Sequence, residues 1–178
     1  MAYKEKFTII HLVEDISPIS GGVATVVNML SKELTDDNFK HEVVCNFALN
    51  NKLSNKVSLK VFRPSKFSLG WGFSFNLLNF IFKRAQQPNT IFHVHGVWKA
   101  IHLIGVLASI KNKTPILLTL HGMMAPMLWN TQGLLKKFKK DIYWSISSNF
   151  FKKIKYVHAI TEIEKKDLKK NFPTSDIS

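Results

Sequence analysis

The chain has 178 residues, which is enough for one domain with a proper core and too few for two ordinary domains. Its hydrophobic content of 46% and its ordinary numbers of glycine and proline exclude a disordered or fibrous protein. The single cysteine, Cys45, excludes an internal disulfide framework, and the formal net charge of +13 favours an anionic partner.

We expect neither an export signal nor a membrane span. The apolar segment Phe7–Val13 is short, and Glu14 and Asp15 follow it where a signal peptide would have a cleavage site. The uncharged run of sixteen residues, Phe67–Phe82, falls short of the roughly 20 apolar residues needed to cross a bilayer. A lone cysteine suits a reducing compartment. These features predict a cytoplasmic protein, at most peripheral at the inner face of the cell membrane.

Short β-branched and aromatic runs alternate with segments of helical periodicity along the chain. The predicted strands are Phe7–Val13, Glu42–Ala48, Val57–Phe62, Thr90–His95, Pro115–Leu120 and Tyr156–Ile160. The predicted helices are Gly22–Leu34, the part of Phe67–Ala85 after Gly72, Trp98–Lys111, Gly133–Lys153, and a last helix that opens with the capping box Thr161–Glu164.

This alternation predicts an α/β fold, a Rossmann-like parallel sheet flanked by helices. We assign residues 1–170 to that domain. Residues 171–178 leave the last helix through Pro173 and Thr174, and we predict that they begin a linker.

Polar and glycine residues follow three of the predicted strands, at the edge where ligands bind in open α/β sheets. A glycine turn opens the first helix, whose amino end offers free N–H groups to an anion. Two strand-end histidines each precede a glycine, and imidazole can hydrogen-bond sugar hydroxyls or phosphate oxygens. The candidates for substrate binding in one crevice are Gly21, Gly22, His95, Gly96, His121, Gly122 and Met123. Trp98, Trp129 and Trp144 could stack on sugar rings, although packing explains them equally well.

We expect no metal site. His93, His95, His121 and His158 are available as ligands, but we assign His93 and His95 to opposite sides of their strand. No carboxylate-rich cluster accompanies them.

Between Lys136 and Lys155 the chain carries seven lysines and one acid, Asp141. Such a block attracts phosphates or anionic lipids, and the aromatic residues among the lysines favour a membrane surface. A solvated helix face remains an alternative. Nucleic acid is not expected, because no nucleic-acid-binding motif accompanies the charge. The predicted membrane-surface residues are Lys136, Lys137, Lys139, Lys140, Lys152 and Lys153.

Five segments, taken together, resemble the amino-terminal domain of GT-B glycosyltransferases, and most closely the retaining family 4 group. They are Pro18–Val23, His93–Trp98, His121–Met123 with Pro126, Lys139–Lys140 and His158–Glu164. The order and spacing of the segments carry the resemblance, which extends over nearly the whole chain.

The resemblance implies a two-domain enzyme that transfers a sugar from a nucleotide-sugar donor to a glycan or lipid-linked acceptor, in bacterial surface polysaccharide synthesis and without an essential metal or other cofactor. This domain would receive the acceptor. The Gly21–Gly22 loop would approach the donor phosphates, and His121 would be the catalytic residue near the reacting sugar. The basic and aromatic surface would rest on the membrane.

The resemblance also implies a carboxyl-terminal domain with an Arg/Lys pair for the donor diphosphate and a two-glutamate motif. No such motif is present here, since Glu162 and Glu164 are too close together to form it. We therefore expect the chain to be inactive without its second domain. The alternative is a non-catalytic sugar- or membrane-binding domain that retains the fold.

Overall fold

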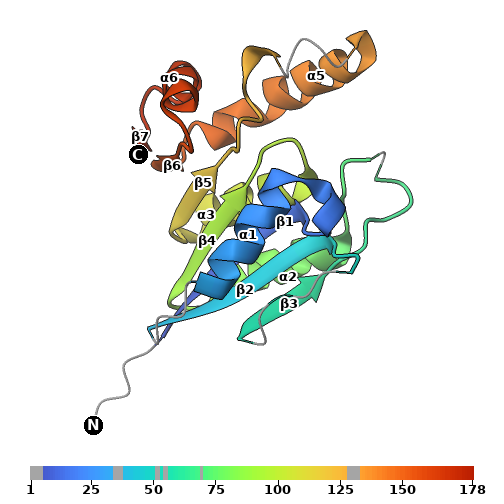
Figure 1. Ribbon diagram of the computed structural model, residues 1–178, viewed down its shortest axis with the longest axis vertical. Coiled ribbons are helices and arrows are strands. Elements are labelled where there is room, and N and C mark those ends of the chain that lie inside the picture. The colour runs from blue at the N-terminus through green and yellow to red at the C-terminus, as the bar shows by residue number, and fades with distance from the viewer. Residues whose placement is uncertain (1–5, 34–37, 51–52, 54–55, 69, 128–132) are drawn as a thin grey trace.

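The computed structural model describes residues 6–33, 38–50, 53, 56–68, 70–127 and 133–178. Its strands form one seven-stranded sheet in the order β3-β2-β1-β4-β5-β6-β7, and every pairing is parallel (Figure 1). The strands are β1 Phe7–Asp15, β2 Phe39–Phe47, β3 Val57–Val61, β4 Thr90–His95, β5 Ile116–Thr119, β6 Tyr156–His158 and β7 Asp176–Ile177.

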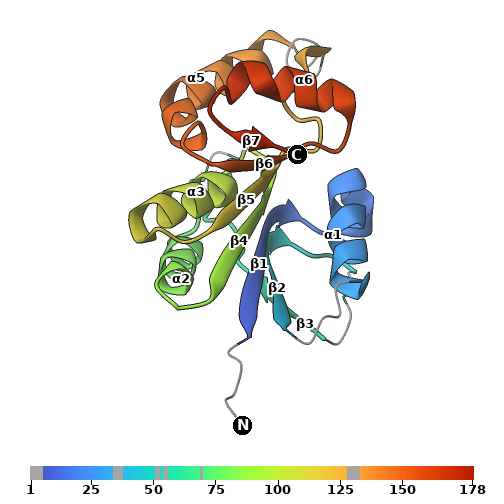
Figure 2. The same cartoon turned by 90° about the vertical axis from the view of Figure 1, so that its left-hand side faces the viewer.

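Helices cover the sheet on both faces. The helix α1 lies on one face over β1 and β2, whereas α2 and α3 lie on the other (Figure 2). The helix α5 packs beside α3, and α6 lies with α5 at the β6–β7 end of the sheet. The bounds are α1 Gly22–Glu33, α2 Phe75–Ala85, α3 Ala100–Asn112, α5 Leu134–Phe151 and α6 Glu162–Asn171, with a short 3-10 helix at Pro18–Ser20.

The predicted fold class is confirmed, since all six predicted strands are present and pair in parallel. The strand β2 begins at Phe39, three residues before the predicted start, and the helix predicted to start at Trp98 begins at Ala100. Leu34, the predicted end of the first helix, and Trp129 lie outside the described residues.

Part of the segment predicted as a linker belongs to the fold. The strand β7 pairs with β6 through bonds in which Ser178 N–H donates to the Val157 carbonyl and Ala159 N–H donates to the Ser178 carbonyl. Phe172, just after α6, is fully buried in the main core. The sequence did not predict β7, because two residues are too few to show strand periodicity.

Alternation along β1 divides the core between the two faces. Ile10 and Leu12 face the larger cluster, which α2, α3, α5 and α6 complete. Val13 faces a smaller cluster with Val27 of α1 and Cys45 of β2. Cys45 is fully buried, and burial, helped by the Asp15 carboxylate, raises the pKa of its thiol to about 12.

Candidate functional site

A cavity of about 340 Å³ lies at the carboxyl ends of β1 and β4, where α1 begins and α3 and α5 approach the sheet. This is the edge at which open α/β sheets bind ligands. The side chains around the cavity combine acids, bases and aromatic surface. They are Val13, Glu14, Asp15, Ser20, Val23, His95, Trp98, Lys99, His102, Met123 and Lys140.

The turn between β1 and α1 forms one wall of this cavity. Asp15 ends β1 and accepts hydrogen bonds from the amide and the hydroxyl of Ser17, at 2.8 and 2.6 Å. Gly21 follows with φ of 85°, a left-handed conformation that glycine adopts readily. A Cβ atom at Gly21 or Gly22 would meet no atom within 4 Å, so the space in front of the turn is open. A ligand can therefore approach the backbone at the start of α1 closely.

Gly96, directly after β4, is required by close packing as well as by its φ of 121°. A Cβ atom there would lie 2.8 Å from Cε1 of His102 and 3.0 Å from Sδ of Met123. The indole N–H of Trp98 donates to the Met123 carbonyl at 3.1 Å, which holds the loop after β5 against the cavity. Gly96 thus leaves room for two cavity-lining side chains, those of His102 and Met123.

His121 lies in the turn after β5 and has a left-handed backbone, with φ of 53°. Glu164 of α6 fixes this turn, because its carboxylate accepts from the Gly122 amide at 2.6 Å and from the Ile160 amide at 2.9 Å. The hydroxyl of Thr161 in turn accepts from the Glu164 amide at 3.1 Å. The Thr161 half of the predicted capping box is therefore formed, whereas the Glu164 carboxylate bonds the amides of Ile160 and Gly122 and so holds the His121 turn.

Charged groups of both signs face the cavity. Lys99 forms an ion pair with Glu14 at 2.6 Å, and Lys140 of α5 lies 5.2 Å from the centre of the Trp98 ring. Burial lowers the pKa of Lys140, and Lys136 adds to the effect. Burial raises the pKa of the Asp15 carboxyl, but hydrogen bonds from Ser17 and from Ser20 outweigh it and hold the pKa below its ordinary value. The cavity therefore offers carboxylates to sugar hydroxyls and ammonium groups to phosphate.

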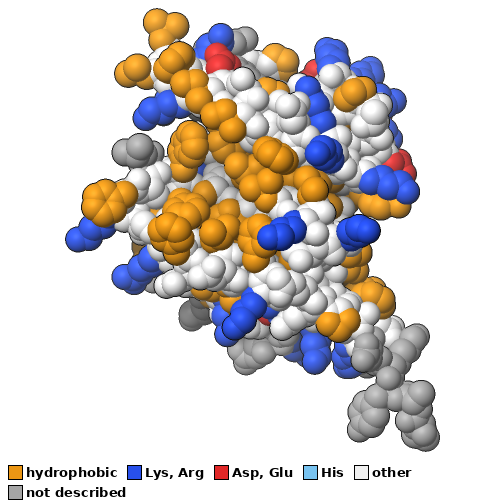
Figure 3. Space-filling model, turned by 180° about the vertical axis from the view of Figure 1, so that it is seen from behind, with side chains coloured by type: hydrophobic (Ala, Val, Ile, Leu, Met, Phe, Trp, Pro, Cys, Tyr) orange, Lys and Arg blue, Asp and Glu red, His pale blue; other side chains and the backbone are white. Residues whose placement is uncertain are grey.

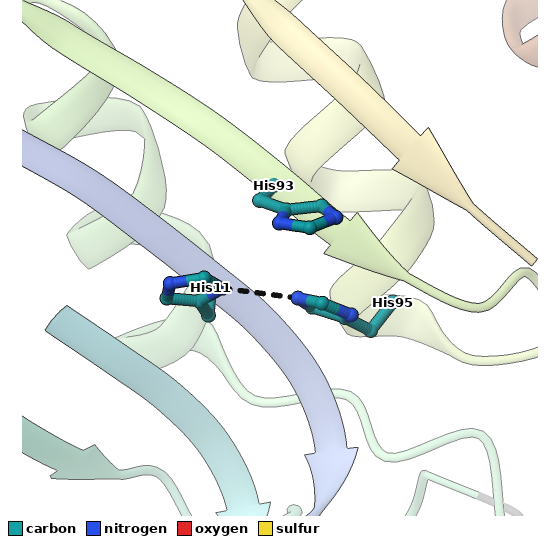
Figure 4. A group of neighbouring side chains, drawn as sticks. All are labelled: His11, His93 and His95. Atoms are coloured by element: carbon teal, nitrogen blue, oxygen red, sulfur yellow. Dashed lines mark hydrogen bonds between the residues drawn. The ribbon is translucent and has the colours of Figure 1, made fainter. Parts of the chain in front are cut away.

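Three histidines, His11, His93 and His95, lie close together on β1 and β4 (Figure 4), and His95 also lines the cavity. The assignment of His93 and His95 to opposite sides of β4 was wrong, because residues two apart on a strand share a face. Their ring centroids are 3.9 Å apart, and His11 of β1 lies 5.3 Å from each. The parallel register pairs His11 with His93, which brings the three rings together.

Among the described residues, His11, His93 and His95 form the one group of three that could hold a metal, with ligand atoms all within 4.8 Å of one another. Two of these atoms already face each other, since His11 Nδ1 and His95 Nε2 are joined by a hydrogen bond of 3.0 Å (Figure 4). His93 Nε2 bonds Thr119 Oγ1 at 2.9 Å. A metal bound through these same nitrogens would have to replace both hydrogen bonds.

Burial keeps these imidazoles neutral. It lowers the pKa of His11 to about 3 and that of His93 to about 4, with neighbouring histidines adding to the effect. The pKa of His95 is held well below its usual value by burial first and by His93, His11 and His121 in addition. Burial also lowers the pKa of His121, against the opposing charge of Glu164.

Two of the predicted substrate-binding residues line the cavity, and the others lie next to residues that do. His95 and Met123 line the cavity, together with Lys140 from the predicted membrane surface. Gly21 and Gly22 follow the cavity-lining Ser20. His121 is not among the cavity-lining residues, but it forms a hydrogen bond of 3.1 Å with His95, which is. Gly96 and Gly122 shape the turns beside these histidines. A role for any of them in binding a substrate stays a prediction.

Sequence reasoning missed several residues around the cavity. Asp15 and Lys99 flank predicted elements and carried no motif of their own, and His11 was taken only as part of a strand. One signal in the sequence could have shown that the histidines lie together. His11, His93 and His95 occupy strand positions that a parallel register aligns on one face, so aligning the strand ends would have grouped them.

A second surface lies on the side of the sheet opposite to the histidines. An apolar groove of about 860 Å³ runs between α2, α3 and α5, and Trp71, Phe73, Phe75 and Leu103 are among its lining residues. Figure 3 shows the apolar side chains gathered on this face with basic side chains around them. Along α5, Leu134, Phe138, Ile142 and Ile146 are exposed at intervals of four residues, which places them on one helical stripe.

The predicted membrane-surface lysines lie on or near the same helix. Lys136, Lys137, Lys139 and Lys140 are in α5, whereas Lys152 and Lys153 follow its end at Phe151. Among the described residues, no helix is both long and apolar enough to cross a membrane.

A model of the family Glycosyltransferase Family 4 matches residues 20–178. The chain belongs to glycosyltransferase family 4. The match covers the glycine turn, both strand-end histidines and the Glu164 clamp, and so confirms the resemblance seen in the sequence. No curated protein is significantly similar to the chain in sequence.

Among solved structures, the family 4 domain resembles a Listeria monocytogenes protein that carries a provisional assignment as a UDP-N-acetylglucosamine 2-epimerase. The two share 15% sequence identity and a TM-score of 0.59, and the similarity covers 97% of this chain. At this identity the likeness shows the fold alone. The chain spans 44% of the length of that structure.

Proposed function

We propose that this family 4 domain is the acceptor-side half of a retaining glycosyltransferase of bacterial surface polysaccharide synthesis. The enzyme would transfer a sugar from a nucleotide-sugar donor to a glycan or lipid-linked acceptor. The observation that carries the proposal is the cavity of about 340 Å³ at the carboxyl edge of the sheet, in which His95, carboxylates and lysines converge. Such a mixture suits a polar, hydroxyl-rich substrate better than an apolar one.

The chemistry of the residues around the cavity suggests a different role for each. The open backbone at Gly21 and Gly22 and the start of α1 would receive the donor phosphates, because helix amino ends attract anions. Asp15 and Glu14 would accept hydrogen bonds from acceptor hydroxyls. His121 would contact the reacting sugar, since its turn is rigidly clamped by Glu164 and its imidazole is neutral.

We propose that a second domain supplies the groups that bind the donor diphosphate and sugar. Preorganised electrostatic stabilisation is usually the largest catalytic contribution, and those groups would provide most of it. The 178-residue chain alone would therefore show little or no transfer. Joined to a matching family 4 second domain, it would transfer sugar, and His121→Ala would lower turnover about a hundredfold or more.

The direct test uses the chain as it is. UDP, GDP and inorganic pyrophosphate are titrated into the ¹⁵N-labelled protein, and amide shifts are followed. Shifts centred on Gly21, Gly22 and Val23 that Gly22→Val abolishes would support donor-phosphate contact. Shifts spread over surface lysines, or no shifts at Gly21, Gly22 and Val23 even after the second domain is joined, would contradict it. Robust transfer by residues 1–178 alone would contradict the need for a second domain.

We further propose that α5 rests on the anionic inner face of the cell membrane. The exposed stripe of Leu134, Phe138, Ile142 and Ile146 runs beside the lysines of the same helix, which is the pattern of an interfacial helix. The apolar groove next to it could receive the hydrocarbon part of a lipid-linked acceptor. Membrane binding without any transfer, even with a second domain, would instead favour the alternative of a non-catalytic binding domain.

Co-sedimentation with vesicles tests this surface. Binding should rise with the phosphatidylglycerol fraction and fall with added salt, because charge attraction is screened over about 8 Å at physiological ionic strength. The double change Lys136→Gln with Lys139→Gln should weaken binding about tenfold or more, at roughly 1 kcal/mol per lysine. The control, Lys169→Gln with Lys170→Gln on α6, removes the same charge and should bind nearly as well as the original chain. Equal losses in the two variants would refute a specific role for α5.

A further inference from the structure

Four imidazoles form a continuous hydrogen-bonded chain across the sheet. His41 Nδ1 lies 3.1 Å from His11 Nε2, His11 Nδ1 lies 3.0 Å from His95 Nε2, and His95 Nδ1 lies 3.1 Å from His121 Nε2. Successive rings are tilted by only 22°, 28° and 23°. Because the nitrogen lone pairs and N–H bonds lie in the ring planes, this near-parallel arrangement suits N–H···N bonds.

The strand register explains why the chain runs diagonally. His41 pairs with Ile9, and His11, two residues further along β1, pairs with His93. His95 is again two residues further along β4 and pairs with Thr119, and His121 follows Thr119 by two. Each step therefore moves one strand sideways and two residues towards the carboxyl edge. The line begins in the buried sheet and ends at His121, one hydrogen bond beyond the cavity-lining His95.

Each link has the same sense, Nδ1 of one ring to Nε2 of the next. A neutral imidazole has one N–H donor and one lone-pair acceptor, and every link needs one of each. If His41 donates through Nδ1, then His11, His95 and His121 must all carry their protons on Nδ1. If His121 donates through Nε2, all four must carry them on Nε2. Any mixture places two protons or two lone pairs face to face.

We propose that His41, His11, His95 and His121 act as one tautomeric unit, so that His41 and His11 are positioning residues that set whether Nδ1 of His121 is a donor or an acceptor. Burial keeps the rings neutral, as the chain requires, by lowering the pKa of all four. In a low-dielectric interior such hydrogen bonds strengthen one another and unpaired polar groups are costly. Both effects oppose a mixed state.

Switching between the two states conserves charge. The three bridging protons each shift one ring along, the proton on His121 Nδ1 passes to water or to a bound group, and His41 Nε2 gains one proton from water. All four rings stay neutral, and one proton has crossed from the His41 end to the crevice. A bound group that accepts from His121 Nδ1 therefore selects one state of the unit, and a group that donates to it selects the other.

The histidine chain matters for catalysis only if the proposed function is right, but its tautomers can be measured without any turnover. The chain could fail as a glycosyltransferase and still show the coupling, or transfer sugar without it.

The test is the tautomer of each ring, read from long-range ¹H–¹⁵N correlation spectra of the 178-residue chain at pH 7.5. We expect His41, His11, His95 and His121 to carry the proton on the same ring nitrogen. Different tautomers among the four would overturn the proposal without any variant having been made.

Coupling over distance is tested at the far end of the chain. His41→Val removes the first link, and the ¹⁵N shifts of His121 should move towards the average of the two tautomers although His121 does not bond His41. His41→Asn, whose amide can occupy the place of Nδ1, should restore the original shifts at least in part. The control is His158→Gln, on the same face but outside the chain of four, which should leave the His121 tautomer unchanged. If the ring ¹⁵N shifts of His121 are unchanged in both His41→Val and His11→Val, the coupling is refuted.

Discussion

His121 combines a left-handed backbone with a side chain on which a buried neighbour depends. From the sequence, a strand-end histidine facing a crevice should contribute little packing, so His121→Ala should cost about 1 kcal/mol or less. The structure raises that expectation, because the change leaves Nδ1 of the buried His95 without its partner. We now expect a loss of about 1–3 kcal/mol in the free energy of unfolding with the fold retained. Urea unfolding followed by circular dichroism measures this loss, and a cost below about 0.5 kcal/mol would show that the His95 bond is unimportant.

Gly96 tests how tightly the cavity wall is packed. Gly96→Ala combines a positive φ with a Cβ only 2.8 Å from the His102 ring. We expect it to lower the free energy of unfolding by about 2–4 kcal/mol. Gly21→Ala is the matched control, because Gly21 also has a positive φ but its Cβ would meet open space, and it should cost only about 1–2 kcal/mol. Similar stability losses in both variants would rule out close packing as the reason for Gly96.

The candidate site could be predicted from the sequence only in part. Strand ends followed by glycine identified His95 and His121, because polar groups at that edge stand out against apolar strands. The partners of these histidines were not predictable in the same way. His41 and His11 lie within strands, and only the lateral register between strands shows that they continue the same line.

At the scale of elements, six strands and their parallel pairing were predictable, because each strand is a short apolar run separated from the next by helical periodicity. The structure at the carboxyl-terminal end of the chain was less predictable. The strand β7 is held by backbone bonds to β6 and by the burial of Phe172, neither of which leaves a periodic pattern. The capping box of α6 was visible in the sequence, but its contact with the Gly122 amide depends on tertiary structure.

That contact gives a prediction for α6. Glu164→Gln leaves a single good acceptor for two amides, those of Gly122 and Ile160, so the free energy of unfolding should fall by about 1.5–3 kcal/mol. Glu162→Gln removes the same charge from an exposed position of the same turn and should cost less than about 1 kcal/mol. Thermal and urea unfolding of the pair separate the two effects. If the variants lose equal stability, helix-end charge and not the clamp explains the role of Glu164.

At the scale of the whole molecule, the buried neutral histidines determine the response of its stability to acid. Burial lowers the folded-state pKa of His11 to about 3 from an ordinary value of 6.5, and those of His41, His93, His95, His102 and His121 are lowered too. Below pH 6.5 the unfolded chain binds protons that the folded chain does not. Stability is therefore fully present above about pH 6.5 and is lost as the pH falls towards the folded-state values.

Each such histidine can remove up to about 1.4 kcal/mol per pH unit, so the free energy of unfolding should fall by at least about 3 kcal/mol between pH 7.5 and pH 5.0. Urea titrations across that range measure it. His93→Gln, which removes one of these groups, should flatten the slope by up to about 1.4 kcal/mol per pH unit near the lower end. A stability that stays constant from pH 7.5 to pH 5.0 would contradict the burial of these rings as neutral groups.

The reactivity of the Cys45 thiol can be used to compare the stability of all these variants. Its thiol is fully buried between β1, β2 and α1, and the raised pKa leaves almost no thiolate in the native state. A thiol-specific reagent can modify it only when that layer opens, so the labelling rate at fixed pH reports the population of open molecules. Since the sequence has no other cysteine, the signal comes from one position without any engineering. Substitutions at distant sites can thus be ranked by labelling kinetics in native buffer, where no denaturant disturbs the histidine chain.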